Sequence, residues 1–196
     1  MNSPGLRERK KQRTRWAIQD AALRLIAEQG YDATTVDQIA AAADISPSTF
    51  FRYFPSKEDL IIQDQYDDIM LAGLRSLPRD LTPLAALRET MRLAFAQMDQ
   101  GELDKVLERT KLIMAVPALR ARSLENFLDM LNMMSGAIAE RTGLDANDFR
   151  IRVIAGAVVG AFVAVLDIWV ESDGGQNLPE LLDRTLEELE SGLALT

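Results

Sequence analysis

The fold of this 196-residue chain is decided by TTVDQIAAAADISPSTFFRYFPSKEDL (Thr34–Leu60). The residues in this stretch predict a nine-residue helix over Thr35–Ala43 and a second, shorter helix that begins after Ser46 and ends near Phe54. Only three residues join the two helices. Two short helices with so tight a connection are typical of a helix-turn-helix, whose second helix enters the major groove of DNA.

Capping residues predict where these helices begin. A side-chain oxygen just before a helix can accept a hydrogen bond from one of the first backbone N–H groups, which have no partner inside the helix. Proline is tolerated as the first helical residue because the N–H that it lacks would have no partner there. The cap at Ser56 predicts a long helix over 57–76. The predicted caps are Thr34 with Asp37 three residues later, Ser46 with Pro47 directly after it, and Ser56 with Asp59 three residues later.

The second short helix has two chemically different faces. Phe50 and Phe54 are four residues apart, so they share one face and are expected to pack on the preceding helices together with Ile45. An outward aromatic residue is suited to a thymine methyl group or a sugar, and an outward arginine to guanine or a phosphate. The residues expected on this outer face are Ser48, Phe51 and Arg52, with Thr49 beside them.

Apolar residues recur at helical spacing along the rest of the chain, and no segment has a convincing strand pattern. The helix before the quoted stretch is expected to end at Gly30. The segment Leu77–Pro83 contains two prolines and predicts a break, and Asp145 is predicted to cap a later helix. Further helices are predicted at about 84–99, 103–115, 118–142, 147–172 and 178–192. The predicted fold is all-α, with about nine helices.

Charge is distributed unevenly along the chain. The net charge is −8, but residues 1–57 hold nine Lys and Arg against six Asp and Glu, whereas residues 58–196 hold 13 against 24. Such asymmetry indicates two halves with different partners. Six of the basic residues lie between Arg7 and Arg15, in a hydrophilic run that is not a secretory signal. This run is either a solvated terminus or a basic arm that contacts DNA.

The chain has no Cys and no His. Disulfides, thiolate metal sites and the commonest general base are therefore excluded, which agrees with a reducing, cytoplasmic location. The sequence contains no paired carboxylates, no phosphate-binding glycine loop and no nucleophile–base set. It therefore predicts no catalytic residues, no metal and no cofactor, and the chain is not expected to be an enzyme.

The decisive stretch, with AALRLIAEQGYDA before it and YFPSKEDL at its end, resembles the DNA-binding domain of the TetR family of transcriptional regulators. The similarity covers roughly residues 10–62. It implies a domain over 1–56 made of a basic arm and a three-helix helix-turn-helix, and a ligand-binding and dimerisation domain over 57–196. Asp44 stands where the family commonly has Gly, and the turn is expected to survive because Asp tolerates a left-handed conformation.

The resemblance also implies which residues contact DNA. Thr34 and Thr35 match positions that hold phosphates at the start of the first short helix, and Tyr53 and Lys57 match further phosphate contacts. Arg52 stands where relatives often have His, Asn or Tyr, so its base partner stays open. The predicted DNA-binding residues are Thr34, Thr35, Ser46, Ser48, Thr49, Phe51, Arg52, Tyr53 and Lys57.

The second domain is expected to sense a hydrophobic small molecule. Methionine is flexible and suits an adaptable apolar cavity, although ordinary core packing is the alternative for each residue. Val116–Glu125 and Thr142–Asp145 resemble a TetR subgroup with an acyl-CoA-type ligand domain, which would make Arg109, Lys111, Arg120 and Arg122 candidate cations for the head group. The predicted ligand-binding residues are Met91, Phe95, Met114, Phe127, Met130, Met134, Phe162 and Leu166.

The run VIAGAVVGAFVAVLDIWV (Val153–Val170) has 18 residues and a single charge, Asp167. Its length is the minimum for a membrane span, but the charge and the many Ala and Gly residues favour a buried helix. Small residues such as Gly156 and Gly160 allow close backbone approach. The resemblance implies a homodimer through helices at about 147–172 and 178–192, and no membrane insertion is expected.

The sequence therefore predicts a homodimeric transcriptional regulator. It would bind a double-stranded DNA operator, most often as a repressor, and a hydrophobic effector would release it by displacing the helix at 57–76. One alternative is a lipid-binding carrier module whose helix-turn-helix no longer functions. Another is a protein that binds DNA without sequence preference, which the acidic second domain disfavours.

Overall fold

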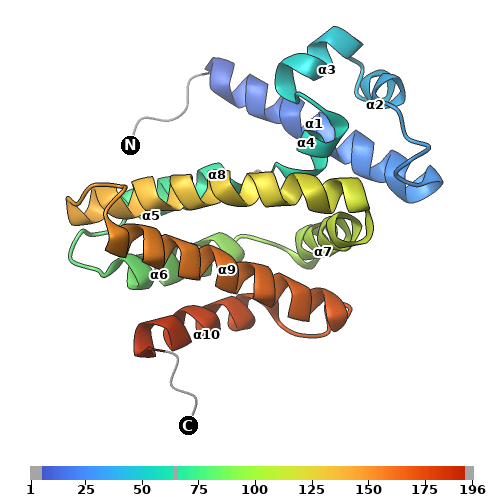
Figure 1. Ribbon diagram of the computed structural model, residues 1–196. Coiled ribbons are helices and arrows are strands. Elements are labelled where there is room, and N and C mark those ends of the chain that lie inside the picture. Colours follow the sequence, from blue (N-terminus) through green and yellow to red (C-terminus); the bar gives the residue numbers. More distant parts are fainter. Residues whose placement is uncertain (1–5, 64–65, 193–196) are drawn as a thin grey trace. The chain divides into compact units, whose positions relative to one another are not determined.

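The computed structural model describes residues 6–63 and 66–192, with side chains from 10 to 63 and from 70 to 192. The described residues form ten helices and no strand, so the predicted all-α fold is confirmed (Figure 1). The side chains of Arg7 and Arg9 lie outside the described residues. The helices are α1 (Leu6–Gln29), α2 (Val36–Ala42), α3 (Pro47–Tyr53), α4 (Lys57–Ile62), α5 (Tyr66–Ser76), α6 (Pro83–Phe95), α7 (Gln100–Ala115), α8 (Pro117–Thr142), α9 (Phe149–Glu171) and α10 (Leu178–Ser191).

The chain folds as two compact units. The N-terminal unit contains the described residues up to Gln63 together with Ile113–Arg122, where α7 ends and α8 begins. We call residues 113–122 the α7–α8 corner. The C-terminal unit contains the remaining described residues. The expected boundary between residues 56 and 57 differs from this division, because α4 and the α7–α8 corner also belong to the N-terminal unit.

The prediction of a single helix over 57–76 is wrong. α4 ends at Ile62, Gln63 has an extended backbone (φ −68°, ψ 119°), and a separate helix begins at Tyr66. The Gln19 side chain of α1 donates to the carbonyl oxygens of Leu60 (3.1 Å) and Gln63 (2.7 Å). In a continuous helix, these carbonyl oxygens would accept backbone N–H groups of the following turn. Because Gln19 of α1 donates to them instead, they are not left without a donor where α4 ends.

The core of the N-terminal unit is built around α1, which contacts α2 and α4, while α2 contacts α3. Gly30 ends α1 in a left-handed conformation (φ 86°), as predicted. Burying large apolar side chains is the main source of stability for so small a unit. Those with less than 2% exposure include Ile18, Ile39, Phe50, Phe54, Leu60, Ile61 and Leu119.

The core of the C-terminal unit lies among α5, α6, α8, α9 and α10. α10 contacts both α6 and α9, and α5 contacts α6. Its buried cluster includes Leu87, Met91, Val158, Trp169 and Leu186. Asp148, and not Asp145, caps α9, because its carboxylate accepts the N–H of Arg150 (2.9 Å). α6 ends at Phe95, four residues earlier than predicted, and α7 begins at Gln100, three residues earlier.

Candidate functional site

The two halves of the helix-turn-helix meet at the predicted turn. Asp44 adopts the left-handed conformation (φ 54°) that the sequence requires of it. Ser46 then caps α3, since its Oγ accepts the N–H of Thr49 at 3.2 Å, and Pro47 is the first helical residue. The predicted Ser46 cap and the proline after it are therefore both present, and they fix where the helix begins.

Two fully buried aromatic rings set the rotation of α3 about its axis. Phe50 and Phe54 are 0% exposed, and their ring centroids are 5.9 Å apart. The guanidinium of Arg15 lies over the Phe54 ring at 4.9 Å and also donates to the Gln63 side chain at 2.7 Å. Arg15 thus belongs to the structure of the unit. With one face of α3 held inward, the opposite face turns to solvent.

The outer face of α3 has the composition of a surface that reads bases. Phe51 is 54% exposed and packs edge-on against Phe50, with ring centroids 5.3 Å apart. Ser48 and Arg52 are exposed as well, and the Arg52 guanidinium lies 5.7 Å from the centre of the Tyr53 ring. The exposed Arg52 guanidinium offers donors for a guanine edge, and the exposed Phe51 ring offers an apolar surface for a thymine methyl group.

The start of α2 differs from the prediction by one residue. Thr35, and not Thr34, is the cap, and Gln38, and not Asp37, completes a capping box with it. Thr34 is 1% exposed, and its hydroxyl donates to the Gly30 carbonyl at 2.8 Å. The Thr34 hydroxyl is therefore used inside the unit, whereas Thr35 stands exposed where a helix N-terminus can meet a phosphate.

Lys57 lies at the first position of α4 and bonds within the N-terminal unit. Its ammonium donates to the carbonyl oxygens of Tyr31 (2.8 Å) and Thr34 (2.9 Å) and lies 3.9 Å from the Tyr31 ring centre. The Tyr31 hydroxyl donates to Glu58 at 2.6 Å. This bond lowers the pKa of Glu58, while burial and the Glu58 carboxylate raise the pKa of Tyr31. Two of the three Lys57 donors are used here, which leaves one for a phosphate.

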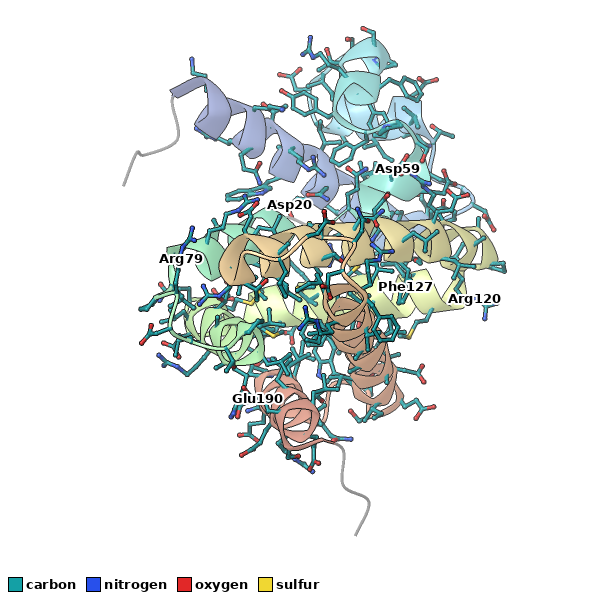
Figure 2. All side chains as sticks on the ribbon, turned by 60° about the vertical axis from the view of Figure 1, so that its left-hand side comes forward. Asp20, Asp59, Arg79, Arg120, Phe127 and Glu190 are labelled. Carbon is teal, nitrogen blue, oxygen red and sulfur yellow. The ribbon has the colours of Figure 1, made fainter. Side chains whose placement is uncertain are left out.

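An ion pair that the sequence did not indicate joins α4 to α8. Asp59, 4% exposed, accepts two bonds on one carboxylate oxygen from Arg122, at 2.9 Å and 2.7 Å (Asp59 is labelled in Figure 2). Its other oxygen accepts from Ser56 at 2.8 Å. Arg122, proposed from the sequence as a cation for a ligand, is therefore bound to Asp59. Lys111, from the same set, pairs with Glu108 and Asp173.

The predicted ligand-binding residues fall into three groups. Met91 is in the C-terminal core, and four others pack against it: Phe95, Met134, Phe162 and Leu166. Phe127 (Figure 2) and Met130 are half-buried on α8. Met114 lies in the α7–α8 corner, which belongs to the N-terminal unit.

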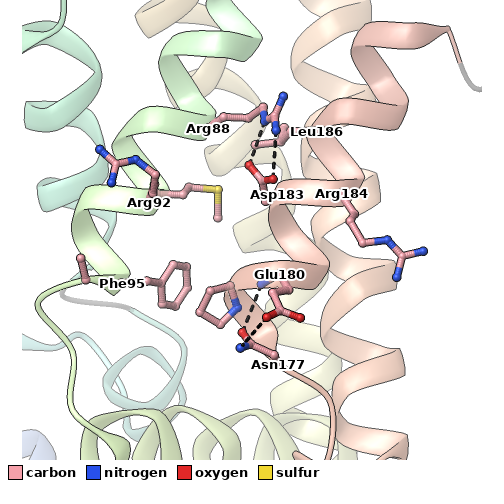
Figure 3. A pocket seen from close by; sticks show the side chains of 11 residues that line it. Arg88, Arg92, Phe95, Asn177, Glu180, Asp183, Arg184 and Leu186 are labelled. Atoms are coloured by element: carbon pink, nitrogen blue, oxygen red, sulfur yellow. Dashed lines mark hydrogen bonds and ion pairs between the residues drawn. The ribbon is translucent and has the colours of Figure 1, made fainter.

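A groove of about 550 Å³ lies between α6 and α10 (Figure 3). Met91, Phe95, Pro179 and Leu186 provide apolar walls, and the Phe95 ring points toward α10. The Arg88 guanidinium crosses from α6 to the Asp183 carboxylate through two bonds of 2.9 Å, which raises the pKa of Arg88. The volume is within the range of small-molecule sites.

The described residues are helical, with a capped and exposed second helix in a helix-turn-helix and a second helical unit built on an apolar core, and this combination is that of a DNA-binding regulator of the helix-turn-helix class. Residues 18–63 match the family described as bacterial regulatory proteins of the tetR family, and residues 81–194 match the MftR C-terminal domain. The chain belongs to the TetR family of transcriptional regulators. Its relatives in this family are regulators and not enzymes.

Similar proteins agree with this assignment. The HTH-type transcriptional regulator TcmR of Streptomyces glaucescens is 38% identical over 172 residues, covering 84% of this chain and 74% of that protein. The solved FadR of Bacillus subtilis in complex with stearoyl-CoA is 25% identical with a TM-score of 0.60, covering 91% and 99%. The FadR repressor of Thermus thermophilus in complex with lauroyl-CoA is 26% identical with a TM-score of 0.56, covering 93% and 96%.

Proposed function

We propose that this protein is a repressor that binds a DNA operator as a homodimer and is released by a hydrophobic, acyl-type effector. The observation that carries the proposal is the outer face of α3, where Ser48, Phe51 and Arg52 are exposed while Phe50 and Phe54 hold the helix in place. Ser46, Thr49 and Tyr53 flank this face, and Thr35 and Lys57 are proposed to contact phosphates. A carrier protein would have no need of this surface.

Dimerisation is supported by the surface of α9. This helix is long and apolar enough to cross a membrane, yet only 28% of its most apolar 18-residue window is buried within the chain. Val153 and Ile168, 51% and 45% exposed, mark a face that also carries the small residues Ala157, Gly160 and Ala164. We infer that a second copy covers this face through α9 and α10, in a cytoplasmic protein. A twofold dimer would read half-sites roughly 34–36 Å apart.

The effector is proposed to bind in the C-terminal unit, against Met91, Phe95, Met134, Phe162 and Leu166, with Phe127 and Met130 nearby in the sequence of α8. The two FadR proteins similar to this chain were solved with stearoyl-CoA and lauroyl-CoA, which supports an acyl thioester as the class of effector. Such a molecule releases the operator only if it binds the released form more tightly than the DNA-bound form.

The proposal is tested by fluorescence anisotropy with the chain's own upstream DNA and a scrambled duplex at physiological salt, with and without lauroyl-CoA. A preference for the upstream DNA of about 10³-fold or more is expected of a specific regulator. Its loss on addition of lauroyl-CoA would support the effector class. Equal, weak binding to both duplexes, with no selected site in a random-sequence library, would favour the carrier module.

Replacing Arg52 with alanine is expected to relax sequence preference. The operator would lose about 1–3 kcal/mol of binding free energy if the guanidinium is bidentate to guanine, while a random duplex would lose less. Lys57→Ala is the comparison, because loss of a phosphate contact weakens binding to all sequences alike; since Lys57 also bonds the carbonyl oxygens of Tyr31 and Thr34, circular dichroism first shows that the variant is folded. Anisotropy titrations of both variants on both duplexes measure this, and equal losses for Arg52→Ala would contradict base reading by Arg52.

A further inference from the structure

The α7–α8 corner (residues 113–122) belongs to the N-terminal unit, while the rest of α7 and of α8 belongs to the C-terminal unit. The corner's Leu119 is 0% exposed, and its Arg122 binds Asp59 of the same unit at 2.9 Å and 2.7 Å. The helices on either side of it, α7 and α8, continue into the C-terminal unit. A segment from the middle of the chain therefore completes the unit that carries the recognition helix.

The first turn of α4 is where this corner is attached, and that turn is fastened to the rest of the DNA-binding surface. Asp59 also accepts the Ser56 hydroxyl, and only Pro55 separates Ser56 from Phe54, the buried residue directly after α3. Lys57 of the same turn is bonded to the backbone that leads into α2. A displacement of Asp59 would therefore move the ends of both helices of the helix-turn-helix.

The other end of the corner's helices lies in the apolar cluster of the C-terminal unit. On α8, Ala137 is 2% exposed in that cluster and Met134 packs against it, while Leu107 of α7 packs against it too. Met134 is twelve residues from Arg122 along one uninterrupted helix, about 18 Å at 1.5 Å per residue. Transmission by this route requires α8 to carry a shift from Met134 to Arg122.

α4 stops at Ile62, and Gln63 after it has an extended backbone, so α4 itself ends within the N-terminal unit. We infer that the α7–α8 corner transmits effector binding to the recognition helix, with the Arg122–Asp59 ion pair as its attachment. This inference rests on the proposed function, since it assigns the route by which the effector acts.

The test replaces Arg122 with alanine and uses Arg120→Ala as the control, because Arg120 is an exposed arginine of the same corner. Three quantities are measured: the operator Kd alone, the lauroyl-CoA Kd alone by calorimetry, and the ratio of operator Kd with and without saturating lauroyl-CoA. Allosteric ratios are typically about 5–150-fold. We expect Arg122→Ala to reduce the ratio to about 1 and to leave the lauroyl-CoA Kd unchanged, whereas Arg120→Ala keeps the ratio. An unchanged ratio in Arg122→Ala overturns the inference.

A second arm needs no effector, so it stands even if lauroyl-CoA fails to bind. Ala137→Leu crowds α8 inside the C-terminal cluster. Its effect on the operator Kd is measured in two backgrounds, one with Arg122 and one with Arg122→Ala. Circular dichroism first shows that Ala137→Leu is folded in each background. We expect a change of several-fold only when Arg122 is present, because interacting sites are non-additive. No change with Arg122 present, or the same change in both backgrounds, overturns the inference.

Discussion

Phe50→Ala is expected to unfold the N-terminal unit while the C-terminal unit stays folded. Phe50 is 0% exposed and touches the rings of Phe51 and Phe54, so its removal leaves a cavity that the small unit cannot fill. Truncating a buried phenylalanine costs about 3–5 kcal/mol, which is a large part of the stability of a unit of this size. Operator binding would be lost with the fold of α3.

The chain's two tryptophans allow the two units to be followed separately. Trp16 is in α1 of the N-terminal unit, and Trp169 is 3% exposed in the C-terminal core. Urea unfolding of single-tryptophan variants (Trp16→Phe or Trp169→Phe) should show the Trp16 transition moved to lower urea by Phe50→Ala. The Trp169 transition should stay in place.

Phe51→Ala is the matched control for Phe50→Ala, since it removes the same ring one position away from a site that is 54% exposed. Its unfolding free energy should change by about 0.5 kcal/mol or less, as for most surface substitutions, while its operator affinity falls. Equal destabilisation by the two variants would contradict an α3 that buries Phe50 and exposes Phe51.

The parts of the structure that sequence alone predicted correctly depend on neighbours within one turn. The Ser46 and Ser56 caps, the left-handed Asp44 and the burial of Phe50 and Phe54 each follow from residues at most four positions apart. Short-range rules of capping and periodicity are sufficient at such distances.

The errors come from contacts between distant residues. The break after Ile62 depends on bonds from Gln19, 41 and 44 residues away in sequence, and Arg122 is bound to a carboxylate 63 residues away. The α2 cap is Thr35 and not Thr34 for a local reason. The Thr34 hydroxyl donates to the carbonyl oxygen of Gly30, the residue directly after α1. Periodicity and charge counts carry no information about which distant group will supply a partner.

Gly160→Glu is expected to convert the protein to a monomer and to cost more operator affinity than any single base contact. Gly160 is exposed on the face of α9 that carries Val153, Ala157, Ala164 and Ile168, with Asp167 two turns further on, and an added Cβ would meet no atom within 4 Å in the protomer. The substitution therefore introduces no clash in the protomer itself. In a dimer formed through α9, it would place a charge in an apolar interface where two backbones approach closely, which is strongly unfavourable.

Loss of the dimer removes the gain from binding two half-sites at once. Linked binding of two modules exceeds either affinity by about 10²–10⁴-fold, so the operator Kd of Gly160→Glu should rise by that factor while a single half-site is bound as before. Sedimentation velocity measures the mass, and anisotropy measures both affinities. Leu93→Glu on α6 is the control, since it places the same charge on another exposed apolar position (45% exposed) and should leave a dimer with unchanged operator affinity. If Gly160→Glu remained dimeric, the second copy would have to be held by a surface other than this face of α9.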